Sequence, residues 1–176
     1  MKKIANMNIA ELAAYVCTHL NNSGIKCILT GGACVSVYTD NKFESFDLDF
    51  IDCTYSSRKK ISEILEKIGF IQNNRYFINK ETKYYIEFPA GPLSIGSEPV
   101  IENNELELPT GKLYLLTPTD SIKDRLAAYY FWEDKQALEQ AVILSKSHNI
   151  NLKEVERWSK AEGQTEKFKI IKKLFR

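Results

Sequence analysis

The sequence predicts an α/β (α+β) protein in which helices flank a mixed β-sheet core and a C-terminal helical bundle follows. Two observations support this fold class. Short apolar segments typical of strands alternate with amphipathic helical segments up to residue 116, and from residue 117 onward the apolar pattern is helical throughout. We therefore expect an α/β core over residues 1–116 and a C-terminal helical region over residues 117–176.

The first predicted elements form a helix, a strand and a second helix. Asn8 and Glu11 have the spacing of a capping box in front of an amphipathic helix that stops near Gly24. Residues 25–29 are predicted to form a short buried strand, and residues 33–38 a short helix after a glycine turn.

The next elements are a strand and an amphipathic helix. Residues 46–53 alternate as a strand does, which places Phe46, Leu48 and Phe50 together on one face and leaves two aspartates of the strand on the other. The helix follows Ser56 and Ser57 and ends near Gly69.

Further strands complete the predicted sheet. Residues 76–78 and 84–88 are expected to form a hairpin. Residues 93–112 contain two prolines and two glycines, so we expect a surface connection with at most a short strand near residues 105–108. Residues 113–116 are predicted to be the last strand.

The C-terminal region is predicted to be helical. Pro118 is acceptable in the first turn of a helix. Apolar residues at helical spacing line this helix and the next one: Ile122, Leu126, Ala127, Tyr130, Ala137, Leu138, Ala141, Val142 and Leu144. A third helix is expected over residues 152–160, and a final helix after Gly163 reaches Leu174.

The composition narrows the class of protein. A chain of 176 residues can bury a sizeable core, and 44% hydrophobic with 27% charged residues is typical of a folded domain. The N-terminus has no sustained apolar signal region, and no apolar stretch approaches the ~18 residues of a membrane span. We expect a cytoplasmic protein without membrane contact. The four cysteines lack CxxC spacing and are predicted to be free thiols, mostly buried: Cys17, Cys27, Cys34 and Cys53.

Two short segments carry residues suited to phosphate and metal chemistry. Gly31 and Gly32 follow a predicted strand and open a helix, whose N-terminus offers backbone N–H groups and a positive dipole end to a triphosphate. Asp47 and Asp49 lie two residues apart in a predicted strand, so their carboxylates share one face, at positions about 7 Å apart along the backbone. Two such charges resist ionising together unless a cation lies between them, and Mg²⁺ prefers these oxygen ligands.

A third acid extends this pattern. Glu87 lies between Ile86 and Phe88 and faces away from the apolar side of its predicted strand. If the hairpin lies beside the strand of Asp47 and Asp49, Glu87 completes a three-carboxylate cluster that can hold two metal ions. Each piece alone is also compatible with a polar strand face or a simple turn; their joint occurrence favours a metal-dependent site.

The three segments resemble the signature of the DNA polymerase β-like nucleotidyltransferase superfamily. That signature has a hydrophobic residue before a Gly-Gly or Gly-Ser pair, then two acids separated by one hydrophobic residue, then an acid between two hydrophobic residues. Residues 117–125, with Trp132 and Asp134, are similar to a helical segment of the small bacterial branch related to abortive-infection and toxin–antitoxin proteins. The interval of 14 residues between Gly32 and Asp47 is longer than is usual in the superfamily.

The resemblance implies roles for individual residues. Two Mg²⁺ ions are expected as cofactors, with a nucleoside triphosphate as substrate. The acids expected to bind the metal and act in catalysis are Asp47, Asp49 and Glu87, and Glu87 would also help to activate the acceptor hydroxyl. The glycines expected to contact the triphosphate are Gly31 and Gly32, and Ser45 is a further candidate for nucleotide binding.

Two cations in the C-terminal region are additional candidates for nucleotide binding. Lys123 and Arg125 could offset the charge of the triphosphate. A solvated helix face, paired with Asp120 and Asp124, explains them equally well. The aromatic segment at residues 129–132 could stack a base, but packing in the core is the better explanation.

The partners are less clearly indicated than the chemistry. The net charge of +1 carries no general signature of nucleic-acid binding, although residues 151–176 contain eight basic and four acidic residues. The basic residues of the last helix could attract an RNA backbone or an acidic partner, or could form a solvated face: Lys167, Lys169, Lys172, Lys173 and Arg176.

Three functional classes follow. The leading hypothesis is transfer of a nucleoside monophosphate to a hydroxyl of RNA, protein or a small molecule, with a cognate partner protein in a toxin–antitoxin or phage-defence system as a further candidate. The second is a catalytically inactive nucleotide- or partner-binding module of the same fold. The third, a haloacid-dehalogenase-type phosphatase, is disfavoured because Ile51 stands where its motif needs threonine.

Overall fold

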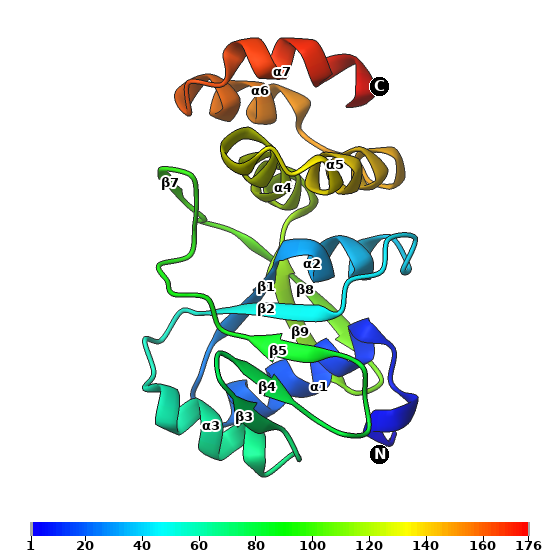
Figure 1. The fold of residues 1–176 in the computed structure, drawn as a ribbon, viewed down its shortest axis with the longest axis vertical. Coiled ribbons are helices and arrows are strands. Elements are labelled where there is room, and N and C mark those ends of the chain that lie inside the picture. The colour runs from blue at the N-terminus through cyan, green and yellow to red at the C-terminus, as the bar shows by residue number, and fades with distance from the viewer. Residues whose placement is uncertain (1, 176) are drawn as a thin grey trace.

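A computed structural model describes residues 2–175 as a mixed β-sheet with helices around it and a stack of helices at one end (Figure 1). The sheet has seven strands in the order β3-β4-β5-β2-β1-β9-β8. Its strands are β1 (Cys27–Thr30), β2 (Asp47–Asp52), β3 (Ile71–Asn73), β4 (Tyr76–Ile78), β5 (Tyr85–Glu87), β8 (Asn103–Leu108) and β9 (Gly111–Leu116). β1 runs parallel to β9 and β2 parallel to β5, and the other neighbours are antiparallel. The predicted fold class is therefore confirmed.

Seven α-helices surround or extend the sheet in the described part of the chain. They are α1 (Ile9–Asn22), α2 (Gly31–Tyr38), α3 (Arg58–Glu66), α4 (Pro118–Trp132), α5 (Lys135–Ser147), α6 (Leu152–Ala161) and α7 (Thr165–Ile171). Figure 1 shows α4 and α5 stacked above α2, with α6 and α7 above them. No helix within residues 2–175 combines the length and apolarity needed to cross a lipid bilayer.

Local sequence signals account for the helix ends. The capping box of α1 forms as predicted: Asn8 Oδ1 accepts from the Glu11 backbone N–H at 2.9 Å, and the Glu11 carboxylate accepts from the Asn8 backbone N–H at 3.0 Å. Ser57 caps α3, and Thr117 caps α4 with Pro118 in its first turn. These contacts satisfy backbone N–H groups that have no partner within the helix.

Some elements differ from the sequence-based expectation. The short strand β3 and the small hairpin of β6 (Ser94–Ile95) and β7 (Glu98–Pro99) were not predicted, and β8 is longer than expected. All three residues of β3 are exposed, so the strand lacks the alternating apolar pattern that identifies a strand in sequence. The last α-helix ends at Ile171, and a 3₁₀ turn continues to Phe175.

Phe46 differs from the two residues predicted to share its strand face. Leu48 and Phe50 are fully buried, but Phe46 is 44% exposed. β2 begins only at Asp47, so Phe46 lies outside the regular alternation of the strand, and its ring lies 5.2 Å from the Lys83 ammonium group.

One cluster of buried side chains runs from the sheet into the C-terminal helices. It includes Phe50 and Phe77 from the sheet and Trp158 and Phe168 from α6 and α7. Side chains from residues 1–116 and from residues 117–176 therefore share this core, and the division into two regions stays a prediction. Cys17, Cys27 and Cys34 are buried free thiols as predicted, whereas Cys53 is only half-buried.

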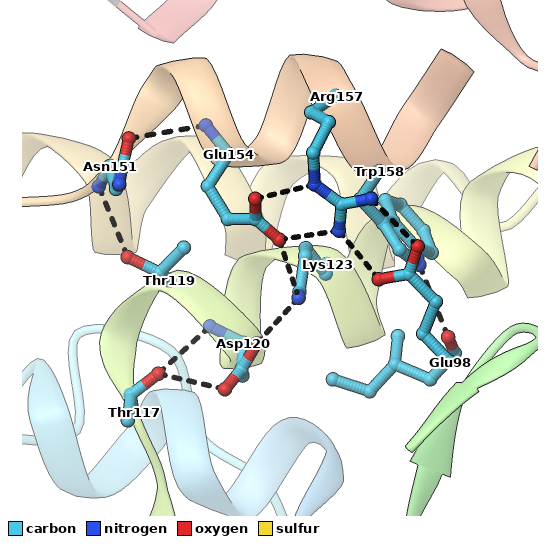
Figure 2. A network of polar contacts seen from close by, with 10 residues as sticks. Glu98, Thr117, Thr119, Asp120, Lys123, Asn151, Glu154, Arg157 and Trp158 are labelled. Atoms are coloured by element: carbon cyan, nitrogen blue, oxygen red, sulfur yellow. Dashed lines mark hydrogen bonds and ion pairs between the residues drawn. The ribbon is translucent and has the colours of Figure 1, made fainter. Parts of the chain in front are cut away.

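The β6–β7 hairpin forms hydrogen bonds and an ion pair with α6 (Figure 2). The Trp158 indole N–H donates to the Ile95 carbonyl at 3.1 Å, and Arg157 forms a two-pronged pair with Glu98 at 2.9 and 2.6 Å. In the turn between the two strands, the backbone N–H of Ser97 donates to the Glu162 carboxylate at 2.8 Å. The buried indole contact matters most for stability, because an unpaired buried carbonyl costs more than an exposed ion pair contributes.

We expect Trp158→Phe to lower the free energy of unfolding by about 1–3 kcal/mol, because it leaves the buried Ile95 carbonyl without its donor and removes packed volume. Urea unfolding followed by circular dichroism measures the change. Trp132→Phe is the matched control: Trp132 is 76% exposed, so its loss is expected to stay below about 0.5 kcal/mol. Equal losses in the two variants would contradict the role given to the hairpin.

Candidate active site

The pairing of β2 with both of its neighbours brings the predicted acids together. Asp49 is the register partner of Thr30 on β1 and of Glu87 on β5. Register partners in adjacent strands project from the same face of a sheet, and Asp47 shares that face because it lies two residues from Asp49. The condition set by the sequence, that the hairpin strand lies beside Asp47 and Asp49, is therefore met.

The glycine turn lies directly against one of these acids. α2 begins at Gly31, which has a left-handed backbone conformation with φ of +71°. A Cβ atom at Gly31 would lie only 2.5 Å from Asp49 Oδ2, so only glycine leaves room for this carboxylate. The long interval between Gly32 and Asp47 does not separate the two motifs, because α2 occupies much of it and antiparallel pairing returns the chain to β1.

The surroundings of Asp49 disfavour the ionised form of its carboxyl group. Burial raises its pKa to about 7, and the neighbouring charges of Asp47 and Glu87 act in the same direction. The Arg125 guanidinium opposes this effect and Asp124 reinforces it. Asp49 therefore occupies a place where a bound cation would be strongly favoured.

Ser45 orients the second aspartate. Its hydroxyl donates to Asp47 Oδ1 at 2.6 Å, and its backbone N–H donates to the Ser36 hydroxyl at 3.0 Å. Ser45 is itself buried, so it holds Asp47 from the protein side and leaves the other carboxylate oxygen free of this contact. Ser45 contacts Asp47 in the structure, and the nucleotide-binding role expected for it from the sequence stays a prediction.

A cavity of about 330 Å³ opens over these residues. Its lining comes from the α2 turn, β2 and its preceding loop, β5, α4 and the first turns of α5: Gly32, Phe43, Glu44, Ser45, Phe46, Asp47, Asp49, Tyr85, Arg125, Asp134, Gln136 and Gln140. The cavity combines carboxylates, a guanidinium group and aromatic rings, which is a composition suited to a charged ligand with an aromatic part.

Sequence reasoning missed the contribution of α5 to this cavity. Gln136 and Gln140 were not candidates, and Asp134 entered only through the family resemblance. Gln140 is 5% exposed and lies in a helix whose other buried residues, Ala137, Ala141 and Leu144, are apolar. An amide on an apolar helix face was a usable signal, because buried polar groups need partners.

Glu87 lies beside the cavity and is not part of its lining. Its carboxylate pairs with the Arg75 guanidinium at 3.4 Å, and its side chain is 19% exposed. Within residues 2–175, no three His, Cys, Asp or Glu side chains converge closely enough to hold a metal ion by themselves, so the three-carboxylate cluster expected from Asp47, Asp49 and Glu87 does not form, although their strands are neighbours. Asp47 and Asp49 do fit a magnesium ion, since Mg²⁺ is commonly held by one or two carboxylates, with phosphate and water oxygens completing its shell.

The two predicted cations occupy different places. Arg125 reaches the cavity, where Asp124 accepts from its Nε and Nη2 at 2.9 and 2.6 Å. Lys123 projects into a separate cavity of about 480 Å³ and pairs with Asp120 at 2.7 Å and Glu154 at 3.4 Å (Figure 2). The structure therefore does not bring Lys123 to the candidate site, because residues two apart on a helix point in nearly opposite directions.

The aromatic segment 129–132 and the basic residues near the C-terminus mostly make contacts inside the protein. Tyr130 is buried as expected, whereas Phe131 and Trp132 are exposed. Three lysines of the last helical segment have partners inside the chain: Lys167 donates to the Tyr130 carbonyl, Lys169 pairs with Glu166, and Lys172 pairs with Glu156. Arg176 lies outside the described residues.

Comparison with solved structures identifies the fold. A nucleotidyltransferase-like antigenic protein from Paracoccidioides brasiliensis superposes with a TM-score of 0.64 at 10% identity, covering 95% of this chain and 91% of that one. The chain has a nucleotidyltransferase fold. The antibiotic-resistance factor ANT(2'')-Ia also matches the nucleotidyltransferase fold of this chain: its crystal structure with adenylyl-2''-tobramycin gives a TM-score of 0.57 at 13% identity, covering 88% of this chain and 96% of that one.

The solution structure of ANT(2'')-Ia gives a TM-score of 0.55 at 13% identity, covering 87% of this chain and 89% of that one. The sequence matches no protein-family model and no curated protein. At these identities the similarity describes the nucleotidyltransferase fold alone; the roles of the site residues in this chain stay predictions.

We expect Asp49→Asn to stabilise the metal-free protein at pH 8 by about 1–3 kcal/mol, a value reduced from ~1.4 kcal/mol per pKa unit because the site is partly open to solvent. A raised pKa means that the neutral acid's contribution is complete below pH ~4 and is lost as the pH rises through about 7. Urea unfolding in EDTA between pH 4 and 8 measures the effect. A difference between the variant and the wild type that does not grow with pH would contradict the assignment.

Proposed function

We propose that this protein is a metal-dependent nucleotidyltransferase that transfers a nucleoside monophosphate from a nucleoside triphosphate to a hydroxyl acceptor. One observation carries the proposal: the Asp49 carboxylate lies against Gly31 at the N-terminus of α2, on the strand face that it shares with Asp47. This arrangement puts a carboxylate whose charge a bound cation would stabilise next to backbone N–H groups that favour phosphate.

Each residue has a defined task in the proposed reaction. Asp47 and Asp49 would hold Mg²⁺, which neutralises charge at the reacting phosphorus and lowers the pKa of the acceptor hydroxyl. The first turn of α2 binds the phosphate chain, and Ser45 keeps Asp47 in position. Arg125 places a positive charge in the lining of the same cavity.

The proposed chemistry balances without a further reactant. The acceptor oxygen forms a bond to the α-phosphorus while the bond from that phosphorus to the bridging oxygen breaks, and pyrophosphate leaves. Glu87 is the group proposed to take the proton of the acceptor hydroxyl, since it is the register neighbour of Asp49 at the edge of the cavity. In this scheme its contact with the exposed Arg75 gives way when the acceptor binds.

The acceptor class stays open among RNA, protein and a small molecule. The basic tail adds little support for RNA, because three of its lysines already contact other groups of the chain. We retain the small bacterial toxin–antitoxin and abortive-infection branch, with a cognate partner protein, as a narrower proposal. It rests on the resemblance of residues 117–125 with Trp132 and Asp134.

The alternative is a nucleotide-binding module that no longer performs transfer. The pairing of Glu87 with Arg75, outside the lining of the cavity, is the observation that favours it. Nucleotide binding that depends on Asp47 and Asp49, without transfer to RNA, protein or small-molecule acceptors, would support this alternative.

We expect Asp47→Asn and Asp49→Asn each to reduce nucleotidyl transfer at least about 100-fold, equivalent to ~3 kcal/mol of transition-state stabilisation. Incubation with Mg²⁺, each α-labelled nucleoside triphosphate and pools of RNA, protein or small-molecule acceptors measures label transfer. Asp52→Asn is the matched control on the same strand: its carboxylate accepts from Thr54 and Ser56 in a local turn and is not part of the cavity lining. Transfer that survives both cavity substitutions would overturn the proposed metal site.

A further inference from the structure

Gln140 reaches from α5 to the glycine turn. It is 5% exposed, although the other buried residues of α5 are apolar, and it lines the cavity that holds Asp47 and Asp49. Burying a primary amide is costly unless its groups find hydrogen-bonding partners. The partners of its two ends therefore indicate what the side chain is for.

Arg125 determines which way the amide points. The Arg125 Nη1 group donates to Gln140 Oε1 at 3.4 Å, and arginine has no acceptor that could bind the opposite end of the amide. The Nε and Nη2 groups of Arg125 donate to the Asp124 carboxylate, so the position of the guanidinium is itself restrained. The carbonyl end of Gln140 consequently faces Arg125, and the amide nitrogen faces away from it.

The amide nitrogen is directed at the phosphate-binding turn. A Cβ atom at Gly32 would lie 3.1 Å from Gln140 Nε2 and 3.2 Å from Ser45 Oγ, so both polar groups crowd the space that the glycine leaves open. Within the described residues 2–175, Gln140 Nε2 donates no hydrogen bond, while Oε1 has its partner in Arg125. Nε2 is not among the fully buried side-chain atoms that lack a partner in residues 2–175, so it is open to the cavity and free to donate to a ligand.

We propose that Gln140 is a binding residue for the phosphate chain of the nucleotide, donating from Nε2 to a phosphate oxygen at the N-terminus of α2. The two N–H bonds of the amide add donors to those of the helix terminus, and a phosphate oxygen accepts them readily. This inference rests on the proposed function, and it adds a residue of the C-terminal helices to the phosphate-binding site of the core. It also assigns Arg125 a second task, which is to fix the orientation of this amide.

Gln140→Glu isolates the proposed donor. The variant keeps an oxygen facing Arg125, where the added charge is favourable, but it replaces the amide nitrogen with an acceptor that repels phosphate. Isothermal titration calorimetry in Mg²⁺ with ATP, pyrophosphate and AMP is the measurement. We expect Gln140→Glu to weaken binding of ATP and pyrophosphate at least about tenfold and binding of AMP by less than about threefold, with a melting temperature close to that of the wild type.

Two further variants make the test specific. Gln72→Glu introduces the same change of charge at an exposed residue of β3 that is not part of the cavity lining, and a loss of ATP affinity below about threefold is expected there. Gln140→Met removes the donor without adding charge and should weaken ATP binding in the same direction, which keeps the test valid if the Gln140→Glu variant folds poorly.

The outcomes separate this inference from the proposed function. If the wild type binds ATP and the Gln140→Glu variant binds it with an affinity within twofold of the wild type, the role of Gln140 alone is overturned. Equal losses of affinity for ATP and AMP in the variant would have the same meaning. A wild-type protein that binds neither ATP nor pyrophosphate in Mg²⁺ would overturn the proposed function, and the role of Gln140 with it.

Discussion

The register in which β2 pairs with β1 on one side and β5 on the other is the constraint on which the candidate site depends. It makes Thr30, Asp49 and Glu87 neighbours across three strands. A shift of one residue in either pairing would turn the acids to the opposite face of the sheet. The buried side chains of Leu48, Phe50 and Ile86 on that opposite face secure the register, so the hydrophobic core and the polar site are specified by the same alternation.

The C-terminal helices supply part of the lining of the cavity that the sheet residues open into. α4 carries Arg125 to the cavity and Lys123 to the ion-pair network on its other side, so one helix connects the site to the contacts that hold α6 and the β6–β7 hairpin (Figure 2). Trp158 lies at the centre of that arrangement, stacked on Tyr130 of α4 and hydrogen-bonded to the hairpin. The position of the cavity wall therefore depends on packing far along the chain from the aspartates.

Features that depend on a few neighbouring residues were predictable from sequence. The capping box of α1, the alternation of Asp47 and Asp49 and the glycine start of α2 all follow from local rules of geometry, and the structure contains each of them. Phe46 is exposed, unlike Leu48 and Phe50, because alternation holds only inside a strand and the sequence does not mark where β2 begins. β3 was missed because an exposed edge strand has no apolar pattern to detect.

The sequence by itself therefore determined the fold class, the acidic pair and the glycine turn, since periodicity and backbone conformation are local properties. Only the tertiary structure decided which distant side chains meet there. The sequence offers Lys123 and Arg125 as equal candidates for nucleotide binding. The packing of α4 places Lys123 against Glu154 and Arg125 in the lining of the cavity. Gln140 reaches Gly32 only because α5 packs over α2, and such contacts between segments about 100 residues apart depend on how the whole chain packs.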